Sequence, residues 1–233
     1  MNVLSIIIPT RNEAKNVKEL VERIKWTLEK DDINYEIVFI DYMSDDDTFK
    51  IVKELKEHYP VSIYAQKTKG KALAIIEGAT YCHGDLILMI DGDLQYPPEA
   101  ISKMYKLSAE FPVVVARRKI NHDKWIRKIA SKIHLFLVGV LLFNLKCDLQ
   151  SGLKLFPKSL IGRINMDYVS DWTLDLPLLI SAKQLGYPIG EVLISFEERV
   201  AGTSKVSILN SFYEHLISAL RIKFFYKSVD PDR

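Results

Sequence analysis

Short apolar runs alternate with stretches of helical periodicity along the first half of the chain. Runs rich in aliphatic and aromatic residues predict buried strands at residues 3–8, 35–40, 61–65, 86–90 and 113–116. After the first run, with Asn12 as a candidate helix cap, apolar residues recur at helical spacing at Val17, Leu20, Val21, Ile24 and Leu28. The alternation predicts an α/β fold in which a mostly parallel sheet has helices on both faces.

The pattern changes in the second half of the chain. Residues 120–146 have a helical and basic pattern, and residues 189–196 predict a late strand. Residues 206–227 are amphipathic, with apolar residues every four positions at Ile208, Phe212, Leu216, Leu220 and Phe224. We expect these helical segments either to pack on the core or to lie at a membrane interface.

Positive charge is concentrated in one part of the chain. The 233 residues carry a formal net charge of only +2, but residues 117–163 contain eleven Lys or Arg and only two acids, Asp123 and Asp148. This segment is either a surface for phosphates and anionic lipid or the solvated face of a helix. It contains no recognisable nucleic-acid-binding module, so we expect no nucleic acid partner.

The cysteine count, the first residues and the length of the apolar runs indicate the cellular compartment and whether the chain spans a membrane. Cys82 and Cys147 are the only cysteines, which favours a reducing compartment over a disulfide framework or a zinc cluster. The chain enters its first predicted strand at once, so we expect no signal peptide. The longest apolar run, residues 133–143, is too short for a full membrane span, which needs about 20 residues.

Two carboxylates follow the fourth predicted strand directly. Asp91 and Asp93 flank Gly92, at the end of a sheet strand where open α/β folds bind ligands. Two like charges so close together repel each other unless a cation binds with them. Carboxylate oxygens suit Mg²⁺ or Mn²⁺, which usually bind substrate phosphates as well. The pair therefore indicates a metal site for a nucleotide diphosphate, with a solvated turn as the alternative.

Polar residues follow the other predicted strands too, at the same edge of the sheet. Glu13 and Asp41 could accept hydrogen bonds from a base or ribose, although both would also suit the start of a helix. Lys69 and Lys71 could bind phosphate, and Gly70 between them would permit close approach of the backbone. Their joint placement predicts a nucleotide site.

In these segments the sequence resembles a known family. Residues 5–13, Ser-Ile-Ile-Ile-Pro-Thr-Arg-Asn-Glu, and residues 41–48 resemble the first two motifs of family 2 glycosyltransferases, which have the GT-A fold. Residues 91–99, Asp-Gly-Asp-Leu-Gln-Tyr-Pro-Pro-Glu, are similar to the metal-binding stretch of polyprenyl-phosphate sugar transferases. Residues 148–156 and 199–205 resemble later motifs of dolichol-phosphate mannose synthases. The five motifs occur in the family's order and extend the resemblance over residues 3–206.

The resemblance implies roles for individual residues. The residues that would bind the nucleotide donor are Pro9, Asn12, Glu13, Asp41, Lys71, Asp91, Gln95 and Lys205. The residues that would hold Mg²⁺ or Mn²⁺ are Asp91, Asp93 and Gln95. Together with the two aspartates, the catalytic set would include the groups that engage the lipid or donor phosphates, namely Arg117, Arg127, Ser131 and Arg199.

The resemblance also implies a reaction and a domain organisation. We expect a metal-dependent, inverting transfer of a sugar, with mannose from GDP-mannose as the first candidate, to a polyprenyl or dolichyl phosphate. This acceptor is already ionised near neutral pH, since its second pKa is about 6, so arginines rather than a base would be needed. Residues 1–206 would form a GT-A catalytic domain and residues 207–233 an amphipathic helix at the membrane interface. The protein would be peripheral on the cytoplasmic face of a membrane, with or without a small membrane-anchoring subunit.

Two departures from the family pattern leave alternatives open. Tyr42 stands where the family has a second aspartate, so a UDP-sugar donor carrying glucose or N-acetylhexosamine is an alternative. Pro177 replaces the glutamate of the family's Phe-Asp-x-Glu-Leu segment, while Asp175 is retained. A nucleotidyltransferase would need a Gly-rich loop near the first strand, which the sequence lacks. A non-catalytic sugar-nucleotide-binding or adaptor protein is a further alternative, against which the complete set of candidate metal ligands argues.

Overall fold

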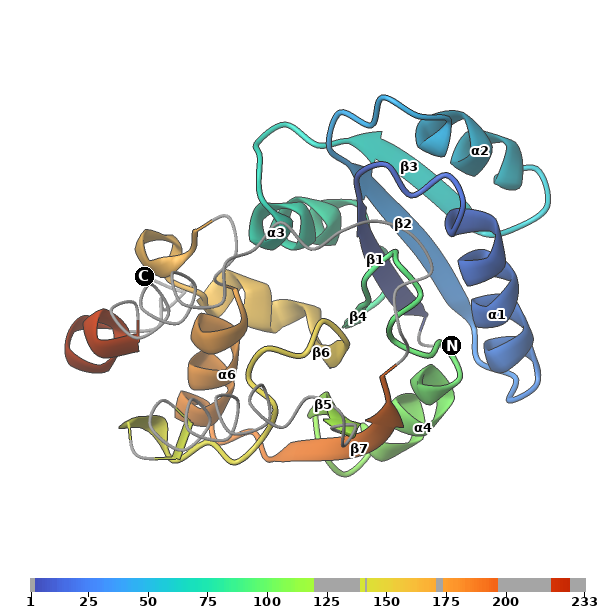
Figure 1. Ribbon diagram of the computed structural model, residues 1–233. Helices are drawn as coiled ribbons and strands as arrows, with labels where there is room; N and C mark the ends of the chain where they lie inside the picture. Colours follow the sequence, from blue (N-terminus) through green and yellow to red (C-terminus); the bar gives the residue numbers. More distant parts are fainter. Residues whose placement is uncertain (1–2, 120–138, 141, 171–173, 197–218, 227–233) are drawn as a thin grey trace.

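The computed structural model describes residues 3–119, 139–140, 142–170, 174–196 and 219–226 (Figure 1). The described strands form one seven-stranded sheet in the order β3-β2-β1-β4-β6-β5-β7. They are β1 (Leu4–Thr10), β2 (Tyr35–Asp41), β3 (Val61–Ala65), β4 (Leu86–Met89), β5 (Val113–Lys119), β6 (Lys154–Pro157) and β7 (Ile189–Ser195). Among these strands β6 alone runs antiparallel to its neighbours, which confirms the predicted mostly parallel sheet.

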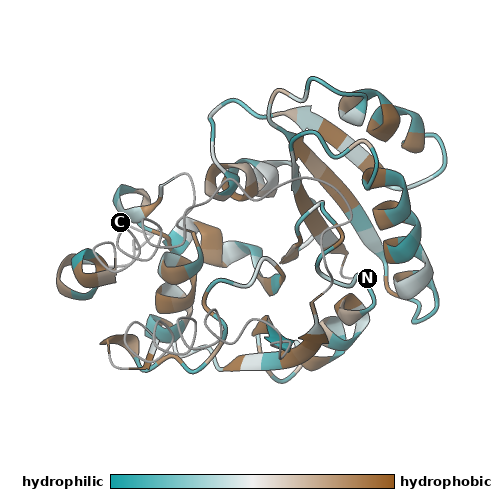
Figure 2. Cartoon of the chain, in the orientation of Figure 1, coloured by the Kyte–Doolittle hydropathy of each residue, from teal (hydrophilic) through white to brown (hydrophobic). Residues whose placement is uncertain are grey.

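Helices cover both faces of this sheet. Helices α1 (Val17–Glu29), α2 (Thr48–Leu55) and α4 (Ala100–Leu107) pack on one face, and α3 (Lys71–Tyr81) and α6 (Asp175–Gln184) on the other. Short 3-10 helices at Lys158–Arg163 and Met166–Tyr168 follow β6. Strand β1 shows how the layers arise, because its alternating side chains place Ile6 and Ile8 in one core and Ile7 in the other. Figure 2 shows hydrophobic residues along the central strands and hydrophilic residues over much of α1.

Two elements were not predicted from the hydrophobic pattern. Strand β6 begins with Lys154 and ends with Pro157, so no uninterrupted apolar run marks it. Helix α6 is buried at every position from Pro177 to Ala182, and this segment therefore lacks a polar side that would reveal helical periodicity. The expected cap at Asn12 was wrong, because α1 begins at Val17 and Asn12 lies in a loop with a positive φ of 62°.

The two later helical predictions fall mostly outside the described residues. Within the predicted helix at 120–146, residues 139–140 and 142–143 are helical, and residues 120–138 and 141 are not described. Residues 144–146 are not helical, so the predicted end of this helix was too late. Within the predicted helix at 206–227, residues 219–225 are helical, and the proposed domain boundary at residue 206 lies outside the described residues. Among the helices that the structure describes, none has the length and apolar content needed to cross a membrane.

Candidate functional site

A cleft of about 290 Å³ opens at the edge of the sheet where the parallel strands end. Loops after β1, β2, β3 and β4 all contribute to it, as the strand-end pattern predicted. It is lined by Pro9, Thr10, Arg11, Glu13, Tyr42, Gln66, Lys69, Gly70, Lys71, Asp91, Gly92 and Asp93. The structure therefore brings together residues that are up to 84 positions apart in the chain, from Pro9 to Asp93.

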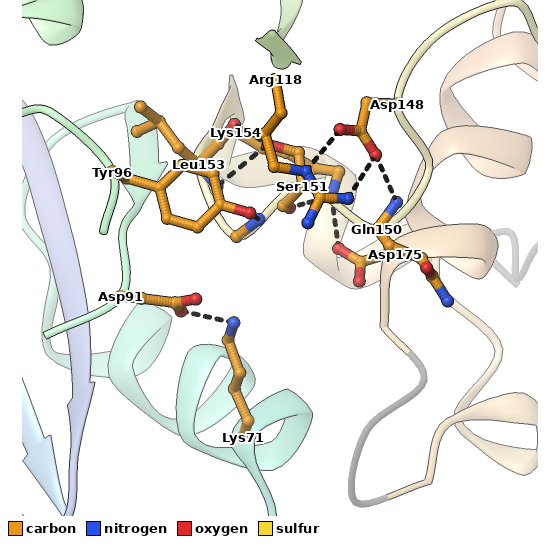
Figure 3. Close-up of polar contacts among 11 residues, drawn as sticks. Lys71, Asp91, Tyr96, Arg118, Asp148, Gln150, Ser151, Leu153, Lys154 and Asp175 are labelled. Carbon is orange, nitrogen blue, oxygen red and sulfur yellow. Dashed lines mark hydrogen bonds and ion pairs between the residues drawn. The ribbon is translucent and has the colours of Figure 1, made fainter. Parts of the chain in front are cut away.

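The two aspartates lie in a tight turn directly after β4. The carboxylate of Asp91 forms an ion pair with the ammonium of Lys71 (Figure 3). Asp93 is 7% exposed, and its Oδ1 accepts a hydrogen bond from the backbone N–H of Gln95 at 3.2 Å. Leu94, directly after Asp93 in this turn, is buried with a positive φ of 60°, a strained conformation for leucine that the surrounding packing must maintain. The turn therefore holds both carboxylates at the cleft.

The donor set of this turn fits a divalent cation. Asp91 already binds a cationic group, and Asp93 lines the same cleft two residues later. Among the described residues there is no cluster of three or more His, Cys, Asp or Glu side chains that could hold a metal. A metal at this site would therefore take two carboxylates from the cleft lining and further oxygens from phosphate and water. This is the usual coordination of Mg²⁺ in nucleotide sites. Gln95, the third predicted ligand, is not among the residues that line the cleft.

The loop before α3 places Lys71 opposite Asp91. Gly70 has a φ of 125°, a conformation that residues with a side chain rarely adopt. The side-chain amide of Gln66 donates to the carbonyl oxygen of Gly70 at 2.7 Å and fixes the loop. Burial alone would lower the pKa of Lys71, but the negative charges of Asp91 and then Asp175 outweigh burial and raise this pKa. Lys71 therefore carries a stable positive charge at the cleft.

Two of the predicted donor residues hold the loops rather than line the cleft. The buried carboxylate of Asp41 accepts hydrogen bonds from the hydroxyl groups of Thr10 at 3.2 Å and Ser44 at 2.5 Å. The side chain of Asn12 accepts from the backbone N–H of Asp45 at 3.0 Å. Both residues join the loop after β1 to the loop after β2, so they fix the shape of this end of the cleft.

The residue after Asp41 presents an aromatic ring to the cleft. Tyr42 lines the cleft, and the guanidinium carbon of Arg11 lies 5.5 Å from its ring centre, within cation–π range. The backbone N–H of Tyr42 donates to the carbonyl oxygen of Thr10 at 2.9 Å, which fixes the backbone of Tyr42 beside the end of β1. The departure noted in the sequence thus replaces an acidic side chain with an aromatic surface.

Basic residues lie at the same edge of the sheet, at the end of β5. The exposed Arg117 has Nη1 3.4 Å from Oε2 of Glu191 on β7. The adjacent Arg118 forms a two-point interaction with Asp148, with N–O distances of 2.8 and 3.0 Å. Burial alone would raise the pKa of Asp148, but the hydrogen bonds and charge of Arg118 outweigh burial and hold this pKa below its usual range.

Four predicted site residues lie outside the described part of the chain. They are Arg127, Ser131, Arg199 and Lys205. Their assignments remain predictions, as do the roles assigned to the residues that the structure does describe.

The sequence did not assign roles to several polar residues beside the cleft. Lys154 is fully buried and paired with Asp175, while Tyr96 accepts a hydrogen bond from the backbone N–H of Gly152 at 2.7 Å (Figure 3). A signal was present at Lys154, because a lysine between Leu153 and Leu155 in a buried segment requires an acidic partner. The sequence could not identify Asp175 as that partner.

Solved structures with the same architecture confirm the GT-A fold. Glucosyl-3-phosphoglycerate synthase from Mycobacterium tuberculosis, crystallised with Mn²⁺, UDP and glucosyl-3-phosphoglycerate, matches with a TM-score of 0.75 and 16% identity. That match covers 95% of this chain and 80% of the other. The same enzyme crystallised with Mn²⁺, UDP-glucose and phosphoglyceric acid gives a TM-score of 0.72 at 14% identity, covering 98% and 86% of the two chains. At these identities the similarity shows the fold alone.

Curated relatives share more of the sequence. A dolichol-phosphate mannosyltransferase from Pyrococcus furiosus is 29% identical over 236 residues, which cover 97% of this chain and 65% of the relative. An undecaprenyl-phosphate 4-deoxy-4-formamido-L-arabinose transferase from Proteus mirabilis is 32% identical over 137 residues, which cover 57% of this chain and 42% of the relative. The chain thus spans less than two thirds of the length of either relative. The sequence profile of Glycosyl transferase family 2 matches residues 5–164. The chain belongs to glycosyl transferase family 2.

Proposed function

We propose that the chain is a metal-dependent, inverting glycosyltransferase that moves a sugar from a nucleotide donor to a polyprenyl phosphate. Transfer of mannose from GDP-mannose to dolichyl phosphate is the first candidate reaction. The observation that carries the proposal is the placement of Asp91, Asp93 and Lys71 together in the strand-end cleft. The names of the curated relatives, which specify dolichol-phosphate and undecaprenyl-phosphate transferases, support the acceptor class.

The donor occupies the cleft in this proposal. Asp91, Asp93 and Gln95 hold Mg²⁺ or Mn²⁺, which stabilises the negative charge of the leaving diphosphate when it is bound. Lys71 binds a phosphate oxygen from the first turn of α3, where the helix dipole also favours an anion. Pro9 and Glu13 line the nucleoside end of the cleft, and Asn12 and Asp41 fix its loops. Lys205 belongs to the segment that closes over the donor.

In this proposal the acceptor approaches the cleft from the end of β5, where Arg117 lies. An ionised phosphate oxygen attacks the anomeric carbon, the bond from that carbon to the nucleoside diphosphate breaks, and the diphosphate leaves with the electron pair. The protein must offset the repulsion between the acceptor phosphate and the donor diphosphate. Planar, permanently charged guanidinium groups suit this task, and the phosphate-binding residues that we assign to it are Arg117, Arg127, Ser131 and Arg199.

A UDP-sugar donor carrying glucose or N-acetylhexosamine is the second candidate. The observation that favours it is Tyr42, whose ring lines the cleft where the family has an acidic residue. An aromatic surface can stack on any base and does not select guanine through a carboxylate. The two candidates therefore differ in the donor and share the acceptor and the metal.

The membrane contact in this proposal is the C-terminal helix, residues 207–233, attached to a catalytic domain of residues 1–206. In the described part of this helix, Phe224 and Phe225 are 74% and 70% exposed. Lys223 in the same turn donates to the carbonyl oxygen of Leu142 at 2.5 Å. The contact joins this helix to the end of the apolar run at 133–143, and exposed aromatic residues beside basic ones are typical of a helix in the headgroup region. We place the protein on the cytoplasmic face, with a separate anchoring subunit as an alternative.

A donor panel tests the proposal. The chain is incubated with GDP-mannose, UDP-glucose or UDP-N-acetylglucosamine, with and without a polyprenyl phosphate and Mn²⁺ or Mg²⁺, and release of nucleoside diphosphate is measured. We expect release that requires both lipid and metal, with one donor preferred. NMR of the glycolipid should show an inverted anomeric configuration. Binding of nucleotide without lipid-dependent release from any donor would contradict the proposal and favour a non-catalytic binding protein.

A further inference from the structure

A lysine is completely buried beside the cleft. Lys154, the first residue of β6, has a side chain with no exposed surface. Its ammonium donates to Oδ1 of Asp175, the first residue of α6, at 2.5 Å, and also to the carbonyl oxygen of Ser151. A buried ammonium is costly unless it is paired and hydrogen-bonded. The pair therefore fixes the Ser151 carbonyl relative to α6.

The Ser151 carbonyl belongs to a turn that lies against Asp91. The backbone N–H of Gly152 in this turn donates to the hydroxyl oxygen of Tyr96 at 2.7 Å. A Cβ atom at Gly152 would lie 2.3 Å from Oδ2 of Asp91, closer than any two such atoms can approach. Figure 3 shows the Asp91 carboxylate between this turn and Lys71. The turn therefore limits where the carboxylate can go.

We propose that Lys154 and Asp175 are positioning residues for Asp91. Through the Ser151 carbonyl they hold the turn at residues 151–153, and Tyr96 holds the same turn through Gly152. This turn at residues 151–153 sets the direction in which Asp91 presents its carboxylate oxygens to a metal. This inference rests on the proposed metal-binding role of Asp91 and deepens it, because it adds two residues that do not touch the metal or the substrate.

A purely structural role for the ion pair predicts a different result. If the pair only joined β6 to α6, its loss would lower the melting temperature, while the folded protein would bind metal normally. Buried ion pairs can often be replaced by apolar residues of similar volume without loss of stability. The double variant K154M/D175L therefore separates the two roles, since it leaves no unpaired buried charge but removes the donor that holds the Ser151 carbonyl.

The experiment measures Mn²⁺ affinity by electron paramagnetic resonance in the presence of GDP or UDP, whichever gives the tighter wild-type complex. Melting temperatures are measured on the same samples. The control is D31L/K106M, which removes an ion pair between Asp31, after the end of α1, and Lys106 of α4, with an N–O distance of 2.9 Å. Neither control residue lines the cleft. The second test variant is Y96F, which removes only the hydroxyl group that accepts from Gly152.

We expect K154M/D175L to stay folded and to bind Mn²⁺ about 10–100-fold more weakly, the usual cost of losing a residue that orients a metal ligand. Y96F should also weaken Mn²⁺ binding, and D31L/K106M should leave it unchanged. Wild-type Mn²⁺ affinity in K154M/D175L, or in Y96F if the double variant does not fold, would overturn the inference. Absence of Mn²⁺ binding in the wild type would instead overturn the metal role of Asp91 on which it rests.

Discussion

Replacing Lys71 with methionine should change the binding of metal and of nucleotide in opposite directions. In the structure, the Lys71 ammonium neutralises Asp91, so a metal that binds Asp91 must compete with it. In the proposed function, the displaced ammonium binds a phosphate oxygen of the donor. Lys71→Met should therefore strengthen binding of Mn²⁺ alone and weaken binding of a nucleoside diphosphate in the presence of Mn²⁺.

The geometry of the pair sets the size of this effect. A hydrogen bond between charged groups contributes about 1.5–3 kcal/mol. The Lys71 and Asp91 side chains are 32% and 25% exposed, so solvent screens part of their attraction. We therefore take the net contribution as roughly 1–2 kcal/mol. Since 1.4 kcal/mol is a factor of ten, we expect a change of about 5–30-fold in each affinity.

Isothermal titration calorimetry measures both affinities. Mn²⁺ is titrated into the protein alone, and GDP and UDP are titrated in the presence of saturating Mn²⁺. Lys69→Met is the matched control, because Lys69 lines the same cleft two residues earlier in the chain. It should leave the affinity for Mn²⁺ alone unchanged. Weaker or unchanged binding of Mn²⁺ to Lys71→Met would refute the competition between Lys71 and the metal.

Three further predictions concern other parts of the molecule. Tyr42→Ala should weaken GDP or UDP binding by about 5–150-fold in calorimetry, since stacking on a base contributes about 1–3 kcal/mol. The same variant should bind pyrophosphate as the wild type does, and an equal loss for pyrophosphate would contradict a base contact. Arg118 lowers the pKa of Asp148, so the pair stabilises the fold at neutral pH, and this contribution is lost as the pH falls below about 4. Urea unfolding of Asp148→Asn should therefore show a flatter decline of stability than the wild type between about pH 5 and 2. A decline as steep as that of the wild type would contradict a stabilising role for the pair. Replacing Phe224 and Phe225 with serine should reduce flotation with anionic liposomes at least about tenfold, whereas wild-type flotation would place the membrane contact elsewhere.

The first half of the fold could be predicted from the hydrophobic pattern because each element there has a distinct period. Val17, Leu20, Val21 and Ile24 all point into one core at helical spacing. The first four strands are apolar runs interrupted only near their starts, at Ser5, Glu36 and Ser62, and at the last residues of β1 and β2. The pattern fails where burial is achieved through charge pairing. Lys154 is polar in sequence but buried in β6, because a carboxylate 21 positions later neutralises it.

The candidate site could be located from the sequence, but its inner contacts could not. The position of Asp91 and Asp93 after a strand predicted the correct edge of the sheet, since the carboxyl ends of parallel strands gather there. Asp41 is the last residue of the neighbouring strand, yet its carboxylate accepts hydrogen bonds from Thr10 and Ser44 and does not line the cleft. Side-chain direction within a loop depends on local hydrogen bonds, which strand-end patterns do not encode.

The most direct test of the central claim is sugar transfer to polyprenyl phosphate by the wild type and by Asp91→Asn, measured at saturating Mn²⁺ with the preferred donor. The substitution keeps the size of the side chain and removes the negative charge that would bind the metal. We predict metal-dependent formation of glycosyl phosphopolyprenol by the wild type and a loss of at least about 100-fold in turnover for the variant, within the range typical when charge stabilisation of a transition state is removed. Turnover near the wild-type level in Asp91→Asn would contradict the account.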